Sequence, residues 1–299
     1  MKSASKKHLW FYPILFGLLG AFLGLIIRFL FAYTEIVFSI KNVIHSHSHI
    51  MLLGLIFNAL VVLIWERFTE GIDNTSYKLY VALQVCIGGM LVVFIIQGYA
   101  FYSILFSTLH LWLSYVFVIR LWKRLKGNAE VLKLIKLGIV FHFVSSIGPY
   151  CLGPLMVFEM SNSPWYQQAV FFYLHFQFFG VLFLLFLALF LKQINANLKR
   201  VHFYVICFSI IGLFAHSLDY SFNHWLINII GGLSSIMLTA YFLTFLKTIR
   251  SQSVSNQIIY IILIVIGICN VLGSLPFFAD LVINNHFILI AWLHLLFLG

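Results

Sequence analysis

The feature that most constrains this chain is a succession of long hydrophobic runs that covers nearly its whole length. Each run holds roughly 18 to 25 residues, enough for a helix to cross a bilayer core of about 30 Å. Charged residues make up only 9% of the 299 residues, whereas ordinary soluble domains contain about a quarter. A water-soluble globule is therefore excluded, and the runs are too many for a signal peptide followed by one anchor.

We expect an all-α fold, a polytopic transmembrane helical bundle of about ten spans. The connections are short and contain no low-complexity linker, so we expect a single transmembrane domain over residues 1–299. The expected spans are 10–30, 43–65, 79–97, 101–121, 134–156, 167–191, 202–218, 223–246, 258–279 and 284–299.

The placement of charge predicts how the chain is oriented. The net charge is +10, but Lys and Arg are spread over alternate loops, before the first span and after the second, fourth, sixth and eighth. The opposite loops contain Lys41 together with Glu35, Glu159, Asp219 and Asp280. By the positive-inside rule we expect a cytoplasmic N-terminus in a bacterial-type cytoplasmic (inner) membrane, with the lipid bilayer and no nucleic acid as partner.

The C-terminal end of the sequence is unusual. The last expected span runs from Asn284 to Gly299 and has no charged flank. A helix of that length crosses only about two thirds of the hydrocarbon. It is either a half-span buried by its neighbours or part of a truncated sequence, and we expect truncation.

Twelve histidines are many for so apolar a chain, and ten of them lie within the expected spans or at their outer ends. A polar side chain in lipid must find a partner, so it faces the bundle interior and often marks a functional site. Imidazole is also a common ligand of haem iron and of copper.

Three of these histidines recur in one short pattern. His49, His175 and His294 each lie five residues before a glycine, in HSHIMLLG, YLHFQFFG and WLHLLFLG. The intervals between them are 126 and 119 residues, and they fall on the second, sixth and tenth expected spans. This recurrence predicts four-helix units in a pseudo-threefold arrangement, with the third unit incomplete.

On these motifs the chain resembles subunit I of the haem-copper oxidase superfamily and its smaller relatives, such as NnrS-type membrane haem proteins. That fold has twelve helices in three four-helix arcs, with haem and copper ligands on helices two, six, seven and ten. The resemblance covers the chain as far as a tenth helix and implies that two helices of the third arc are missing.

The resemblance implies a set of ligands. His49 and His294 match the axial ligands of the low-spin haem, and we expect haem b. The copper ligand of helix six matches His175, and helix seven offers His216, with His224 across the loop. His45 and His47 compete for the first position, but His47 lies about 200° around the helix from His49 and points elsewhere.

Two departures from the family pattern argue against a complete binuclear centre. The family's high-spin haem ligand falls on Trp292, which cannot bind iron, and its cross-linked tyrosine falls on Phe179. No Asp or Glu lies near the middle of an expected span, although carboxylates usually relay protons there. We therefore expect one bis-histidine haem rather than oxygen reduction with pumping.

The expected function is that of a membrane b-type haem protein for electron transfer or for handling a small gas such as NO or O2. Two imidazole ligands leave iron six-coordinate and suited to electron transfer. Arg28, near the outer end of the first span, is the candidate partner of a haem propionate. The resemblance implies a redox partner subunit or a quinol, and whether the chain is an oxidoreductase-like enzyme stays open.

Two other interpretations stay open. The histidines could form an outward-facing relay in a metal-ion carrier without haem, although the lack of buried carboxylates and Met-rich runs weakens that case. Alternatively, the chain is a helical scaffold whose histidines bond helices together and whose glycines allow close helix approach.

Overall fold

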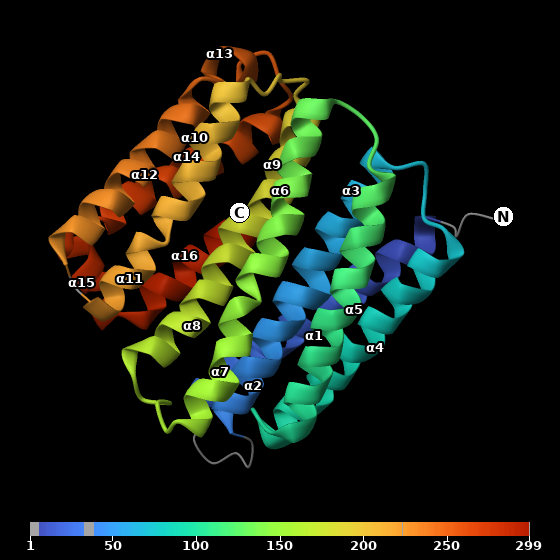
Figure 1. Ribbon diagram of the computed structural model, residues 1–299, viewed down its shortest axis with the longest axis vertical. Helices are drawn as coiled ribbons and strands as arrows, with labels where there is room; N and C mark the ends of the chain where they lie inside the picture. Colours follow the sequence, from blue (N-terminus) through green and yellow to red (C-terminus); the bar gives the residue numbers. More distant parts are fainter. Residues whose placement is uncertain (1–5, 33–38, 223, 299) are drawn as a thin grey trace. The chain divides into compact units, whose positions relative to one another are not determined.

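The computed structural model describes residues 6–32, 39–222 and 224–298, and these ranges contain helices and no strand (Figure 1). Nine of the described helices are long and apolar enough to cross a membrane, or ten if a bent pair near the C-terminus counts as one span. The prediction of an all-α bundle of about ten spans is confirmed, and the protein is an integral membrane protein. The chain forms two compact units, residues 1–127 and 128–299.

The first unit contains four spans. The second of them changes its helical geometry along its length, from α-helix through a π-helical segment and back to α-helix. The elements are α1 (Lys6–Ala32), α2 (Ile40–His49), the π-helix η1 (Ile50–Phe57), α3 (Asn58–Phe68), α4 (Asn74–Gln97) and α5 (Phe101–Arg124).

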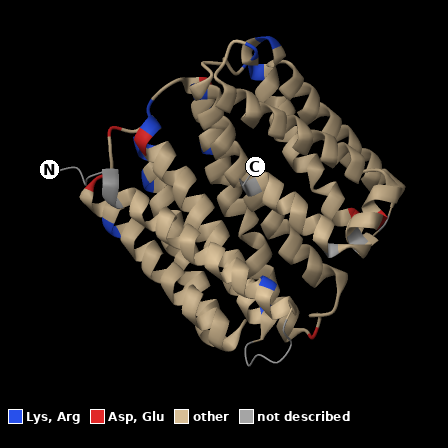
Figure 2. Ribbon diagram, turned by 180° about the vertical axis from the view of Figure 1, so that it is seen from behind, with Lys and Arg blue, Asp and Glu red and all other residues tan. Residues whose placement is uncertain are grey.

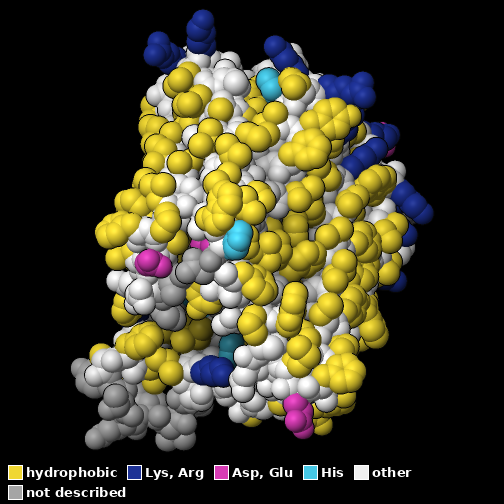
Figure 3. Space-filling view, turned by 60° about the vertical axis from the view of Figure 1, so that its left-hand side comes forward, with side chains coloured by type: hydrophobic (Ala, Val, Ile, Leu, Met, Phe, Trp, Pro, Cys, Tyr) yellow, Lys and Arg dark blue, Asp and Glu magenta, His cyan; other side chains and the backbone are white. Residues whose placement is uncertain are grey.

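The core of the first unit includes a narrow row of buried apolar side chains along α1, called here the apolar seam. Helix α1 buries a large hydrophobic side chain at every seventh residue, and the apolar side chains on its other faces can remain exposed because they face lipid. Phe16 of this seam packs with Ile50 of η1 and with Met90 and Phe94 of α4. Hydrophobic side chains likewise cover the face in Figure 3, as lipid contact requires. The buried large hydrophobic residues of α1 are Leu9, Phe16, Leu23 and Leu30.

The second unit contains the remaining spans, three of which are interrupted, the seventh of them at Phe214 between two helices. The fifth span breaks at Ser146, and the sixth contains a second π-helix. Its elements are α6 (Ala129–Ser145), α7 (Ile147–Val157), α8 (Pro164–His175), the π-helix η2 (Phe176–Leu182), α9 (Phe183–Gln193), α10 (Arg200–Leu213), α11 (Ala215–Phe222), α12 (Trp225–Leu243), α13 (Leu246–Ile249), α14 (Val254–Gly273), α15 (Pro276–Asn284) and α16 (His286–Leu298).

The last two spans differ from their predicted boundaries. The ninth span ends at Gly273, and Pro276 occupies the first turn of a new helix, where its missing N–H costs no hydrogen bond. Segments of α15 and α16 then form a helix pair bent by 97°. Asp219 and Asp280, which the sequence placed in loops, lie inside α11 and α15.

Charged residues gather near the ends of helices and leave long uncharged stretches between them (Figure 2). In the first unit, Asp73 caps the N-terminus of α4 and accepts hydrogen bonds from the backbone of Thr75 and Ser76. Its two carboxylate oxygens also contact Arg120 and Arg124 of α5, at 2.9 and 3.1 Å. This network fastens the start of α4 to the end of α5.

The Asp73 network should make the first unit sensitive to acid. Burial alone would raise the pKa of Asp73, but hydrogen bonds from Ser76 and Arg120 and the charge of Arg124 outweigh it. They lower the pKa from 3.8 to about 2. A carboxyl with a lowered pKa stabilises the fold above pH 4 and loses that contribution as the pH falls toward 2. We expect Asp73→Asn to cost about 1–2 kcal/mol at pH 6.

Thermal unfolding in detergent at several pH values checks this expectation. The stability difference between the wild-type protein and Asp73→Asn should shrink between pH 4 and pH 2.5. Glu159→Gln is the control, because Glu159 is an exposed carboxylate that forms no salt bridge among the described residues. An equal difference at pH 6 and pH 2.5 would contradict the assignment.

Candidate functional site: two groups of histidines

The first group of histidines lies at the end of α2 in the first unit. His45 and His49 are one helical turn apart and share a face. Nε2 of His49 forms a 2.9 Å hydrogen bond with the hydroxyl of Tyr99, and its ring stacks on Phe94 at 4.4 Å. The ring of His45 meets Tyr99 edge-on at 4.7 Å. Nε2 of His45 is buried and has no hydrogen-bond partner among the described residues.

His47 faces a different helix, as the sequence predicted. Its Nδ1–H donates to the backbone carbonyl of Gly20 in α1, at 2.9 Å. Its ring is therefore directed away from the face shared by His45 and His49. Arg28, the candidate propionate partner, lies near the end of α1 with an exposed side chain.

Tyr99 is a member of this group that the sequence analysis missed. It follows Gly98, which has a φ of +63° and lies against the side chain of Asn42 in α2. A side chain at position 98 would be strained by this φ and would collide with Asn42. Gly98 thus lets the loop between α4 and α5 lie close to α2. A glycine followed by an aromatic residue at the end of a span was the available signal.

His49 and His175 occupy equivalent local positions in the two units. Each is the last residue of an α-helix that continues into a π-helix, η1 or η2. The glycine of each motif lies inside the π-helix against an aromatic ring, Gly54 on Phe16 and Gly180 on Phe141. The recurrence therefore has a structural counterpart at two of its three positions. At the third, Gly299 lies outside the described residues.

The second group contains His175 and His216, which lie close enough to interact electrostatically. His175 is buried, and its Nε2–H donates to the carbonyl of Ile210 at 2.9 Å. The hydroxyl of Ser235 donates to the carbonyl of Gly231, so Nε2–H of His216 donates to the Ser235 oxygen, at 3.0 Å. In both rings Nδ1 keeps the lone pair that binding a metal requires.

The remaining predicted ligands have other surroundings. His224 is exposed and caps α12, where its Nδ1 accepts a hydrogen bond from the backbone N–H of Leu226. Among the described residues it forms no hydrogen bond with His175 or His216. His294 is exposed on α16, and its Nδ1–H donates to the carbonyl of Ile290 at 2.7 Å. That bond leaves Nε2 of His294 as the nitrogen with a lone pair.

No group of three or more His, Cys, Asp or Glu side chains within the described ranges is placed to hold a metal ion. A metal bound by either histidine group would need further ligands, such as the Tyr99 hydroxyl, water or the ring of a cofactor. His142 has a different role, because its Nδ1 lies 3.1 Å from the amide nitrogen of Gln177, which also donates to Ser145.

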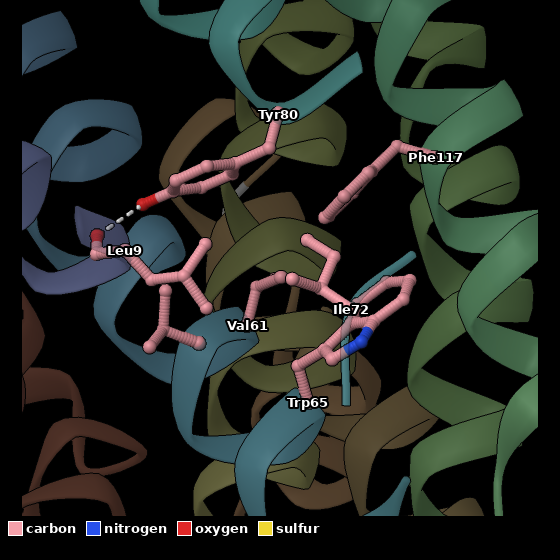
Figure 4. A pocket seen from close by; sticks show the side chains of 7 residues that line it. Leu9, Val61, Trp65, Ile72, Tyr80 and Phe117 are labelled. Carbon is pink, nitrogen blue, oxygen red and sulfur yellow. Dashed lines mark hydrogen bonds between the residues drawn. The ribbon is translucent and has the colours of Figure 1, made fainter. Parts of the chain in front are cut away.

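A small cavity in the first unit is lined by no side chain that could bind a metal or haem iron through an imidazole, carboxylate or thiol (Figure 4). The side chains of Leu9, Trp65 and Phe117 contribute to its apolar walls. The hydroxyl of Tyr80 donates to the backbone carbonyl of Leu9 at 3.0 Å. No imidazole, carboxylate or thiol lines it, so the histidine groups are the candidate sites. Val61, Val62 and Ile72 complete the lining.

Comparisons with protein-family models, with curated proteins and with solved structures find no match for this chain.

Proposed function

We propose that this integral membrane protein binds a b-type haem and serves electron transfer or the handling of a small gas. His49 and His294 are its proposed axial ligands. The observation that carries the proposal is the α-to-π junction directly after both His49 and His175, since π-helical turns in α-helices occur frequently at functional sites. Bound haem would supply a six-coordinate iron that exchanges one electron.

The hydrogen bonds of the two proposed ligands bear on this assignment in different ways. His294 donates from Nδ1 to its own helix, an arrangement that orients metal-bound imidazoles and leaves Nε2 for iron. His49 bonds to Tyr99 through Nε2, so iron at that nitrogen would replace this hydrogen bond. Arg28 is the proposed partner of a propionate, and a redox subunit or a quinol is the proposed electron partner.

Absorption spectra of variants test the haem proposal. The protein is expressed with haem supply and purified in detergent, and reduced-minus-oxidised spectra are recorded. We expect sharp low-spin bands in the wild type, their loss in His49→Ala and in His294→Ala, and their retention in Tyr99→Phe. His47→Ala is the matched control and should keep the bands. It also removes an imidazole from α2, but this imidazole bonds to the carbonyl of Gly20 and is not a proposed ligand.

Two outcomes would count against this assignment. Wild-type protein without a haem spectrum would contradict haem binding altogether. Bands that persist in His49→Ala but disappear in His45→Ala would transfer the ligand role to His45, whose Nε2 has no hydrogen-bond partner among the described residues.

A second candidate function is metal-ion binding without haem, with copper bound by His175 and His216. The hydrogen bonds of both rings fix the same tautomer, which favours this candidate. Copper and zinc contents of the same preparations test it. Copper should be present in the wild type and in His224→Ala, and absent from His175→Ala and His216→Ala. Copper content that is equal in all four proteins would contradict it.

A further inference from the structure

Asp219 is the one acidic side chain that is buried in the described part of the chain, at 7% exposure. It lies in α11, three residues before the last residue of its span. An ionisable side chain at such a position requires compensation of its charge, and it commonly marks a binding site.

The surroundings of Asp219 supply too few donors. Its carboxylate interacts with the backbone N–H of His224 and with the side chain of Asn228 in α12. Even so, Oδ1 of Asp219 is buried without a hydrogen-bond partner among the described residues, and so is Oδ1 of Asn228. Two acceptor oxygens on neighbouring helices therefore lack a donor, although most buried polar atoms in proteins have one.

The charge around Asp219 is negative, and no basic side chain in the described ranges pairs with it. Asp280 of α15 adds a second carboxylate close enough to interact electrostatically with Asp219. Within the described ranges no Lys or Arg forms a salt bridge with either carboxylate. The imidazole of His224 accepts a hydrogen bond at Nδ1 from the backbone of α12. Asp219 and Asn228 thus lie together on two packed helices, and the second carboxylate, on α15, is near enough to act on Asp219 electrostatically.

We propose that Asp219, Asn228 and Asp280 bind a calcium ion. Calcium takes six to eight oxygen ligands from carboxylates, amide carbonyls and water, in flexible geometry. Two carboxylates balance its charge, and the unpartnered Oδ1 atoms of Asp219 and Asn228 become ligands. The end of a span gives water access to the remaining positions. Magnesium fits less well, because it requires strict octahedral geometry.

Calcium titration of the full-length protein in detergent tests this proposal, with calorimetry and thermal unfolding as readouts. Saturating calcium should raise the melting temperature of the wild type by about 5 °C. Magnesium at the same concentration should have little effect. In Asp219→Asn the calcium effect should disappear, and in Asp280→Asn the calcium affinity should fall at least tenfold.

Glu159→Gln is the matched control and should bind calcium like the wild type. It removes an exposed carboxylate that lies in the same unit but is not one of the three proposed ligands. Asp280→Asn changes an exposed side chain, so it tests the proposal even if Asp219→Asn does not fold. No calcium effect on the wild type would overturn the proposal. An equal effect in all variants would also overturn it.

Discussion

Alanine in place of Gly54 or Gly180 should destabilise the protein by about 1–3 kcal/mol. A methyl group at position 54 would lie 2.7 Å from Cβ of Phe16, and one at position 180 would lie 2.7 Å from Cγ of Phe141. These atoms are at the base of their side chains and cannot rotate away. The helices would have to separate, and the close contacts along them would be lost.

The controls are Gly88→Ala and Gly153→Ala, because nothing lies within 4 Å of a methyl group at either position. Alanine favours a helix over glycine by about 1 kcal/mol, so the controls should be neutral or stabilised. Unfolding in detergent is followed by thiol labelling, at buried Cys86 in the first unit and at half-buried Cys207 in the second. Equal effects in all four variants would contradict the prediction.

These glycines show which part of the repeated motif the structure explains. The sequence left two roles open for them, a site marker and a residue that allows close helix approach. At Gly54 and Gly180 the structure places an aromatic ring directly on the backbone, so close approach is confirmed for both. The ligand role of His49, His175 and His294 stays a prediction.

The spans were predictable because the membrane imposes length and composition before any tertiary contact forms. Nine predicted spans correspond to described helices. The break after Gly273 was missed because apolar composition continues through Pro276 and α15. Hydropathy predicts whether a residue lies in lipid or in water, but it does not predict where one helix ends and the next begins.

Positions around a single helix were also predictable, whereas contacts between helices were not. The rotation of about 100° per residue correctly separated His47 from His49. The bond between His49 and Tyr99 joins residues 50 positions apart and depends on the positive φ of Gly98. His224 is exposed and caps a helix, a role that a sequence scan for metal ligands does not consider.

Leucine in place of Asn58 should destabilise the first unit by about 1–3 kcal/mol, because it leaves a buried amide without its partner. Asn58 and Gln84 are both buried and bond to each other in both directions, at 2.7 and 3.3 Å. Asn58 also donates to the carbonyl of Gly54 in η1, and Gln84 to that of Tyr80. The pair thus joins the π-helical second span to α4.

The double variant Asn58→Leu with Gln84→Leu separates pairing from packing. Each single variant leaves one buried amide unpaired, whereas the double variant leaves none. We expect the double variant to lose less stability than the two single variants combined, by about 0.6–1.7 kcal/mol, the average and the maximum found for side-chain hydrogen bonds inside membranes. Labelling of Cys86, which is buried on α4, reports unfolding of this unit. Additive losses would show that the two amides act independently and that η1 and α4 are joined by apolar packing alone.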